Sequence, residues 1–569
     1  MENEILEKSI KPDLYDPPFT NREYVYVNDK SGSNYSNDEL QYDLTGLANT
    51  GNFSDFANGY LVLPVVGCVS DNLATLLDNQ NDFCFGLKNG FHHLLNRISL
   101  TISNKQVIEA TDFTNLPIHF KLITQMSNEA METMGDSMGM YLDDTTGMKY
   151  ISNKYAETQG FGECNNVIND VNFEASRGYS NYGMAVNKGF RRRMINTNYS
   201  LKAHNGLQKF NTEDALKLSL KNYSIQKDAT ERGAICYYIV ATIRLGDIHD
   251  LFNKMCLVQG LSAVLKVYTN MPCSFSIEHN ATPAYKQGQS LSVNLQSRAS
   301  GVIPFMTPPI GGGLHLSGVE GTLTTSLALV KVIDPRQTAF NFPLHPLQST
   351  RIYIPMLTMS IQNASKYFSS ISSSGLPIKT VEYDEVAYYP LVNVAIGRFD
   401  QMLTNSVQRI RALLVVPVVS KSVNGGGDSN ATNQFGISPL SSPFSSACGT
   451  STNAIITNYN VQLSGKAVYA SNIDYGFEMF QHEVAQYYAL GGNIDRQQAS
   501  GLISQSNYEN GYRYLFTNLS RKNKDYDNVG QSVNIRGVNS SNCILDFHCF
   551  IFYQKSIKIN VADGTLISE

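Results

Sequence analysis

The sequence has few charged residues and no excess of positive charge. Charged residues make up 16% of the 569 residues, against about 25% in a typical soluble protein. The formal net charge is −5. A protein that coats nucleic acid with its whole surface needs a basic excess to displace counterions. This class is therefore excluded, and any contact with nucleic acid is expected to be local.

Cysteine pairs at a metal-binding spacing are also missing. The nine cysteines are scattered and never form a C-x-x-C pattern. Cys543 and Cys549, with His548 beside the second, form the densest group. A structural zinc site needs four ligands, however, and no second pair is in view. We therefore expect buried, free thiols.

Export and membrane signals are absent from the sequence as well. The segment M-E-N-E-I-L-E-K-S-I-K at residues 1–11 is acidic and lacks the hydrophobic region of a signal peptide. No apolar run approaches the ~18 residues of a membrane span, and residues 412–419, among the longest runs, contain Pro417. We expect a protein that is made in a reducing compartment inside the cell and is not secreted.

Catalytic motifs are incomplete wherever they begin. His482 and Glu483 open an H-E-x-x-H pattern, but Gln486 stands where the second zinc ligand would be, which favours an exposed helix pair. His92 and His93 are adjacent and cannot both face one side of a helix or strand, so we interpret them as two structural histidines. The sequence has no nucleophile elbow, Walker pattern or dinucleotide fingerprint. We predict no catalytic, cofactor-binding or metal-ligating residue, no cofactor and no enzymatic activity.

Three charged groups have no partner that spacing would identify: Asp143 with Asp144; Glu382 with Asp384 and Glu385; and Lys188 with Arg191, Arg192 and Arg193. A solvated loop or strand edge is the favoured interpretation of each group. Contact with phosphates or with a partner's carboxylates is the alternative for the basic group. The six methionines within residues 126–148 are interpreted as gap-fillers under a long loop, with an adaptable contact surface as the alternative.

Short β-branched and aromatic runs separated by turn residues dominate the rest of the chain and predict strands. Two of these runs resemble each other, since residues 60–66 (Y-L-V-L-P-V-V) and 351–359 (R-I-Y-I-P-M-L-T-M) both carry a proline after four extended-favouring residues. Residues 118–123 are also predicted as a strand. Residues 475–490 have apolar positions at helical spacing and predict an amphipathic helix.

The length and these patterns predict two large β-domains, because 569 residues exceed the size of one ordinary core. We predict an arm over residues 1–40, a first β-domain over 41–334 with a loop insertion at 126–231, and a second β-domain over 335–569. The likeness of the two proline-bearing runs suggests that the second domain duplicates the first, with residues 351–359 as its first strand.

Several segments of the second half resemble the major capsid proteins of polinton-like viruses and virophages: residues 342–360 (F-P-L-H-P-L-Q-S-T-R-I-Y-I-P-M-L-T-M-S), 413–419 (L-L-V-V-P-V-V), 460–480 (N-V-Q-L-S-G-K-A-V-Y-A-S-N-I-D-Y-G-F-E-M-F), 512–522 (Y-R-Y-L-F-T-N-L-S-R-K) and 532–553 (S-V-N-I-R-G-V-N-S-S-N-C-I-L-D-F-H-C-F-I-F-Y). The resemblance implies an all-β fold of two tandem eight-stranded antiparallel jelly-roll sandwiches with short helices and long loop insertions. By this analogy, residues 41–334 form the first jelly roll and 335–569 the second.

The same resemblance implies a structural role in a virion. Three chains would form a pseudo-hexameric homotrimer that tiles an icosahedral shell with neighbouring capsomers, a penton protein and minor capsid proteins. Residues 126–231 and 423–452 would be candidates for the outer crown, and the arm for an inner or neighbour contact. Direct contact with nucleic acid or membrane stays open. The rival interpretations are a carbohydrate-binding or adhesin-type β-sandwich that uses exposed tyrosines, and a β-sandwich hydrolase, which would need convergent carboxylates.

Overall fold

The computed structural model describes most of two β-sandwiches and the helices around them. The residues that it describes are 19–31, 35, 39–71, 85–143, 149–150, 163–164, 188–195, 234–279, 292–297, 301–306, 321–329, 349–372, 375–420, 440, 450, 454–487, 500–520, 528–541 and 544–567. All statements about structure concern these residues.

The first sandwich pairs an eight-stranded antiparallel sheet with a four-stranded one. The large sheet runs in the order β1 (Asn21–Asn28), β17 (Arg351–Thr358), β4 (Tyr60–Asp71), β16 (Gly321–Leu329), β13 (Cys273–His279) and β14 (Ser292–Ser297), with β11 (Ala234–Arg244) on β4 and β3 (Phe53–Ser54) on β17. The small sheet runs β2 (Glu39–Asp43), β12 (Ala263–Thr269), β6 (Leu95–Ile102) and β7 (Lys105–Ile108). A further sheet contains β10 (Met194–Ile195), β5 (Phe85–Leu87) and β15 (Phe305–Met306).

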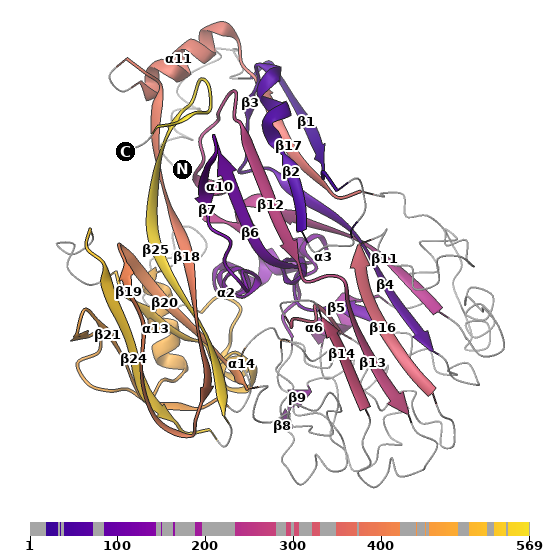
Figure 1. Cartoon of the computed structure of the whole chain (residues 1–569), viewed down its shortest axis with the longest axis vertical. Coiled ribbons are helices and arrows are strands. Elements are labelled where there is room, and N and C mark those ends of the chain that lie inside the picture. The colour runs from indigo at the N-terminus through magenta and orange to yellow at the C-terminus, as the bar shows by residue number, and fades with distance from the viewer. Residues whose placement is uncertain are drawn as a thin grey trace.

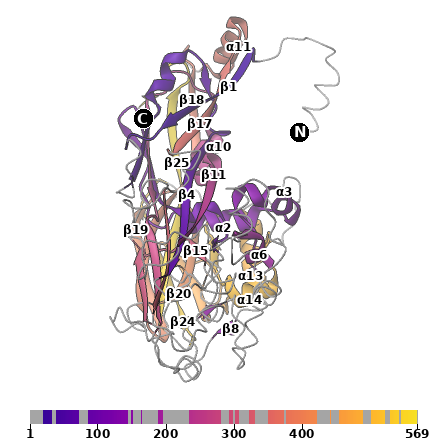
Figure 2. The same ribbon diagram turned by 90° about the vertical axis from the view of Figure 1, so that its right-hand side faces the viewer.

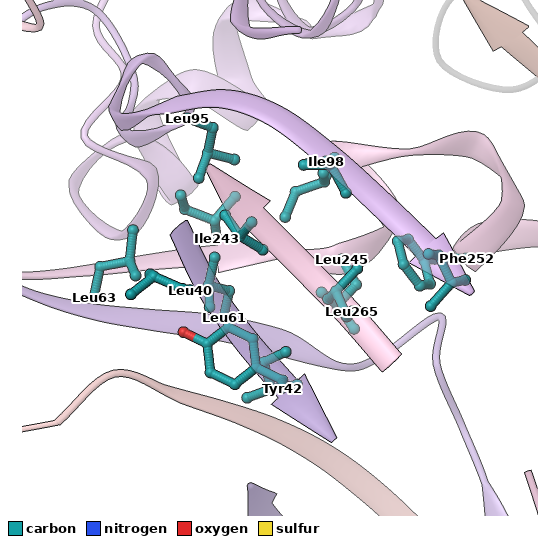
Figure 3. Packing of buried hydrophobic residues seen from close by; sticks show 14 of the residues in the cluster. Leu40, Tyr42, Leu61, Leu63, Leu95, Ile98, Ile243, Leu245, Phe252 and Leu265 are labelled. Atoms are coloured by element: carbon teal, nitrogen blue, oxygen red, sulfur yellow. The ribbon is translucent and has the colours of Figure 1, made fainter. Parts of the chain in front are cut away.

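Alternation along the small sheet fixes which face is buried. In β12, every second side chain is buried, and β2 follows the same period. Leu40 and Leu265 of this sheet meet Leu61 and Leu63 of β4 across the sandwich, with Ile243 of β11 among them (Figure 3). The apolar side chains of two inner faces therefore form the first core.

The second sandwich is smaller. Its five-stranded sheet runs β18 (Ile378–Val394), β25 (Leu545–Asn560), β20 (Ile410–Val419) and β23 (Leu515–Asn518), with β26 (Leu566–Ile567) on β25. Its four-stranded sheet runs β19 (Gly397–Val407), β24 (Gln531–Asn539), β21 (Ile456–Leu463) and β22 (Lys466–Ala467). The prediction of two tandem antiparallel sandwiches is confirmed, and short added strands raise the strand number in each above eight.

The predicted domain boundaries at residues 40 and 334 are wrong for two strands. β17 lies in the first sandwich, where Arg351 pairs with Val62 of β4 and Tyr353 with Tyr60. β1, which the sequence assigned to an arm, pairs along the whole of β17. The two proline-bearing runs are thus neighbours in one sheet. Their likeness reflects a shared environment, since both strands have neighbours on each side.

The prolines of these two strands occupy equivalent breaks in the pairing. On one side of β4 the partner is β17 up to Val62 and β16 from Val65 onwards, so Pro64 falls between two partners. On one side of β17 the partner is β4 up to Tyr353 and β3 from Met356, so Pro355 also falls between two partners. A proline is tolerated there because its missing N–H removes no ladder bond on that side.

Helices connect and cover the sandwiches. They are η1 (Leu44–Thr50), η3 (Phe91–Leu94), α2 (Asn115–Gln125), α3 (Asn128–Met138), α6 (Lys188–Arg193), α9 (Leu245–Ile248), α10 (Asp250–Lys254), α11 (Ile361–Ile371), α13 (Phe477–Tyr487) and α14 (Gln505–Gly511), and a two-stranded sheet pairs β8 (Lys149–Tyr150) with β9 (Glu163–Cys164). Figure 2 shows α2, α3, α6, α13 and α14 on one side of the strands. The predicted helix at residues 475–490 is confirmed as α13. The predicted strand at 118–123 is wrong, because those residues lie in α2, which has apolar side chains on both of its sides.

Candidate functional site: the junction and the exposed faces

Helix α2 fastens the first sandwich to the second. Its Ile118 belongs to the first core, whereas Leu116, Phe120 and Ile123 belong to the second. The Phe120 ring centroid lies 5.1 Å from that of Phe516 on β23. Burial of one such ring contributes about 1.5–3 kcal/mol to the stability of the folded chain. The side of α2 that carries Phe120 is therefore part of the second core.

Strands β18 and β25 make the reverse connection. They pair from Ile378 with Asn560 down to Val394 with Leu545, and in Figure 1 they run side by side from the end near α11 into the second sandwich. Their upper ends enter the first core through Tyr383 and Ile559. The Tyr383 hydroxyl also donates a 2.9 Å hydrogen bond to the Val107 carbonyl of β7. Each half of the chain therefore supplies residues to the core of the other, and the two sandwiches form one unit.

A charged cleft of about 380 Å³ lies beside this junction. Its lining includes Lys121 of α2, His249, Asp250 of α10, and Asp384 and Glu385 of β18. Lys121 lies 3.8 Å from a carboxylate oxygen of Asp250, and His249 Nε2 lies 3.3 Å from Glu385 Oε1. The first contact joins α2 to α10. The second joins His249, which directly precedes α10, to β18, the strand that continues into the second sandwich.

Two carboxylates of this cleft, those of Asp384 and Asp250, accept hydrogen bonds from other parts of the fold. Asp384 Oδ2 accepts a 3.0 Å hydrogen bond from the Tyr487 hydroxyl, and Asp250 Oδ2 accepts one of 3.1 Å from the Asp384 amide. Burial raises the pKa of Asp384 above its ordinary value. The predicted solvated edge is wrong for Glu385, which is 2% exposed. These contacts give the cleft a positioning role between the sandwiches.

His92, His93 and His119 form a buried cluster that sequence reasoning missed. The centroids of the adjacent His92 and His93 rings lie 4.2 Å apart, and those of His93 and His119 lie 4.8 Å apart. The argument that adjacent residues cannot face one side fails because η3 is a single tight turn and not a regular helix or strand. Gly90 permits this turn: its φ is +108°, and a Cβ there would meet His92 Cε1 at 2.1 Å.

Two more charged residues are buried that the sequence placed in solvated loops. Arg193 of α6 contacts Asp143 through a 2.6 Å ion pair, and both side chains are inaccessible. Its Nε also donates to the Leu87 carbonyl of β5 at 3.2 Å. The neighbouring Arg192 stays near the surface, 2.6 Å from Glu132. The solvated-loop interpretation is therefore wrong for Arg193 and Asp143, whereas Asp144 lies outside the described residues.

The H-E-x-x-H near miss also divides into a surface part and a buried part. His482 Nε2 lies 2.7 Å from Gln486 Nε2 on the exposed side of α13. Glu483 is fully buried and accepts a 2.8 Å hydrogen bond from the Asn518 amide of β23, so the predicted exposed pair is wrong for this residue. The expected buried thiol is confirmed for Cys273 and Cys549, and burial raises the pKa of both. Cys543 lies outside the described residues.

Met126 and Met140 are buried in the second core, which confirms the gap-filling interpretation for these two methionines. Met134 on α3 is 42% exposed. Most of the predicted insertion at residues 126–231, and most of 423–452, lie outside the described residues, so the crown assigned to them stays a prediction.

Exposed apolar side chains gather on strands that end their sheets. Among the described residues, β1, β18 and β19 are each terminal in their sheet order. Tyr24 and Tyr26 of β1 are each 51% exposed, and Met402 of β19 is 62% exposed. Unpaired edges that carry apolar groups are favourable places for contact with another chain.

Helix α11 adds a further apolar surface at one end of the molecule (Figure 1). None of its residues is buried, and Ile361 at its start is 90% exposed. The helix is held from one side only, where the Tyr367 and Phe368 rings lie 5.6 Å and 5.7 Å from that of Phe53. No helix of the described residues is long and apolar enough to cross a membrane.

Comparison with known proteins gives structural neighbours only. No protein-family model and no curated sequence matches the chain. A chain in the cryo-EM structure of the Sputnik virophage is 10% identical, and the match covers 98% of this chain and 90% of that one with a TM-score of 0.52. The Faustovirus major capsid protein (11% identity, 98% and 92% coverage, TM-score 0.44) and the mavirus major capsid protein (9%, 99% and 92%, 0.38) are more distant.

The likeness to the Sputnik chain extends over nearly the whole sequence, so it includes both sandwiches and the junction between them. Together with the strand orders, it identifies the architecture that the sequence resemblance implied. The chain has the double jelly-roll fold, with two tandem antiparallel sandwiches joined by α2, β18 and β25.

Proposed function

We propose that the protein is the major capsid protein of a virophage or polinton-like virus and has a structural, non-enzymatic role. The observation that carries this proposal is the match of the double jelly-roll fold over 98% of the chain to a chain in a virophage particle. The sequence resemblance points to the same family. The contacts of Asp384 with Tyr487 and of Glu385 with His249 in the junction cleft support a structural role over hydrolysis.

The arrangement of the two sandwiches suits a shell-forming subunit. Two sandwiches joined in one chain through α2, β18 and β25 present two similar sides, and three chains would present six. We propose a pseudo-hexameric homotrimer that packs against neighbouring capsomers, with a penton protein and minor capsid proteins completing an icosahedral shell. The chain would be made inside the host cell and located in the virion capsid.

The exposed strands are the proposed contact surfaces between chains. Tyr24 and Tyr26 of β1, Met402 of β19 and Ile361 of α11 would be covered on assembly, because exposed apolar groups on unpaired edges gain most from contact. We also propose revised domains, with the first jelly roll ending at β17 and the second starting at β18, and α11 between them.

The mass in solution tests this function. Three chains of 63.0 kDa give a trimer of about 190 kDa, which light scattering after size-exclusion chromatography would detect. A stable monomer at micromolar concentration would overturn the proposal.

A carbohydrate-binding or adhesin-type module is the second candidate, favoured by the exposed tyrosines of β1. The ring centroids of Tyr24 and Tyr60 lie 5.9 Å apart, and those of Tyr60 and Tyr353 lie 5.0 Å apart, so the rings form a continuous aromatic strip. Specific binding of a glycan by a monomeric protein would favour this candidate, whereas a trimer that binds no glycan would exclude it.

A further inference from the structure

Three imidazole rings from two separate elements converge in a buried space beside the junction. His92 and His93 belong to η3 and His119 to α2, and all three are buried. One ring nitrogen from each lies within 4.8 Å of the others. The double jelly-roll architecture does not by itself require three histidine side chains at this point.

The spacing of two ring nitrogens is close to that of ligands on one metal ion. His92 Nε2 lies 3.0 Å from His119 Nδ1. Two nitrogens bound at about 2.0–2.1 Å to a tetrahedral zinc ion are roughly 3.3 Å apart. Only the third ring would have to move closer for a complete set of three nitrogen ligands.

The surroundings of His93 leave polar atoms without partners. Among the described residues, His93 Nε2 and His119 Nε2 have no hydrogen-bond partner, and neither do the buried Oδ1 atoms of Asn115 and Asn270. Both asparagines contact His93: Asn115 Nδ2 lies 3.1 Å from His93 Nδ1, and Asn270 Nδ2 donates to the His93 carbonyl at 2.8 Å. Buried polar atoms without partners are stabilised when a water molecule or an ion binds beside them, so these atoms are consistent with an ion site.

The Asn115 amide can take the orientation that a metal ligand needs. If its oxygen and nitrogen are exchanged, Oδ1 accepts from His93 Nδ1–H and the lone pair of His93 Nε2 becomes available. Metal-binding histidines commonly donate their other ring N–H to an oxygen in this way.

We propose that His92, His93 and His119 bind one divalent transition-metal ion, with Zn²⁺ the preferred occupant. Three imidazoles without a thiolate suit Zn²⁺, and a water molecule would take the fourth position. This water could donate a hydrogen bond to Asn270 Oδ1, which has no other partner among the described residues. The proposal does not depend on the capsid function.

The protonation state of the cluster favours metal binding. Burial lowers the pKa of His92 and His93 well below the ordinary value and that of His119 to about 3. The rings are therefore neutral at pH 7, which is the form that ligates metals.

Two nearby cations weaken the expected affinity of this cluster for a metal ion. Lys88 and Arg193 are near enough to lower the pKa of His93 further, and the same field disfavours a metal cation. Asp143 offsets one of them through its 2.6 Å contact with Arg193. We therefore expect weaker binding than at a site with an acidic ligand.

A bound ion would strengthen the junction. It would join η3 of the first sandwich to α2, whose Phe120 is buried in the second core. Metal binding is therefore expected to raise the thermal stability of the whole chain and not only of one segment.

Metal content and affinity test the proposal. The full-length chain, made without a histidine tag, is dialysed against a chelator and titrated with Zn²⁺ alone. We expect about one zinc ion per chain and a higher melting temperature. Substitution of His119 by glutamine (H119Q) should weaken binding at least tenfold, because a ligand is lost. The matched control H482Q, at the exposed histidine of α13, should bind as the unsubstituted chain does.

Zinc at background level in the unsubstituted chain, or equal affinity in H119Q, would overturn the proposal. If H119Q does not fold, Co²⁺ replaces Zn²⁺ in the unsubstituted chain. The intense visible bands of tetrahedral, nitrogen-ligated Co²⁺ would then support the site, and a spectrum identical to that of hydrated Co²⁺ would refute it.

Discussion

The two sandwiches use different parts of the partner to complete their cores. The second sandwich receives one side of a helix, since α2 places Leu116, Phe120 and Ile123 inside it while Ile118 stays in the first core. The first sandwich receives the ends of strands, with Val381 and Tyr383 of β18 and Ile559 of β25 in its core and Leu566 of β26 packed against it. The second core therefore depends more strongly on residues from outside its own half of the chain.

This difference indicates that the two sandwiches fold together as one unit. A strand end that enters a neighbouring core remains paired with its own sheet, as Tyr383 does with Lys555 of β25. Helix α2 belongs to no sheet in the second sandwich and is held there mainly by side-chain packing, together with a 2.8 Å hydrogen bond that the Leu502 amide donates to the Ile123 carbonyl. Loss of packing at α2 should therefore cost more than loss of a contact at β18.

The largest effect is expected from Phe120→Ala. Phe120 is fully buried and packs on rings of the second sandwich, so the substitution should lower the free energy of unfolding by about 3–5 kcal/mol. Urea unfolding followed by circular dichroism measures this change. Phe368→Ala, in the partly exposed packing of α11 on Phe53, is the control and should cost about 1 kcal/mol. Equal losses in the two variants would show that α2 is not the main connection.

Lowering the pH should reduce the free energy of unfolding through the cluster of His92, His93 and His119 before it affects the contacts between strands. The folded pKa of each of the three rings is below the unfolded value of 6.5, so the unfolded chain binds more protons between those two values. Stability is thus complete above pH 6.5 and falls as the pH decreases. Each ring contributes a slope of up to about 1.4 kcal/mol per pH unit.

Unfolding in urea at a series of pH values between 7 and 4, in the presence of a chelator, measures this slope. H119Q should show a shallower slope than the unsubstituted chain, and H482Q an unchanged one. A slope that H119Q leaves unaltered would assign the acid sensitivity to other groups.

The smallest effect is expected from Tyr383→Phe, which removes the hydroxyl that donates to the Val107 carbonyl. The carbonyl is left without this donor in a buried place, and the cost should be about 1–2 kcal/mol. The same substitution at the exposed Tyr26 should change the free energy of unfolding by less than about 0.5 kcal/mol. A loss at Tyr383 that exceeds the loss at Phe120 would reverse the comparison.

Much of the fold could be predicted from local patterns. Runs of β-branched and aromatic residues identified strands β4 and β17, and helical spacing identified α13. The pattern misled at residues 118–123, because an apolar run in a helix that lies between two cores resembles a buried strand. The prediction for residues 351–358 was wrong about the domain, since this strand pairs with β4 of the first sandwich. The sequence of a strand indicates how far the strand is buried, but not the sheet to which it belongs.

The histidine cluster could not be predicted for a different reason. His119 is separated from His92 by 27 residues, and only the packing of α2 against η3 brings their rings together. The burial of Glu483, Arg193 and Asp143 was equally invisible, since each depends on a partner from a distant part of the chain.

Residue periodicity and chain length by themselves determined a strand-rich chain with two large domains, whereas the tandem jelly-roll sandwiches followed from the resemblance to virophage and polinton-like capsid proteins. The tertiary structure decided the partners: β17 and β1 joined the first sheet, α2 entered the second core, and three histidines met at one point. The physical reason is that pairing and packing are chosen by complementarity between surfaces far apart in the chain, and periodicity carries no information about which surface complements which.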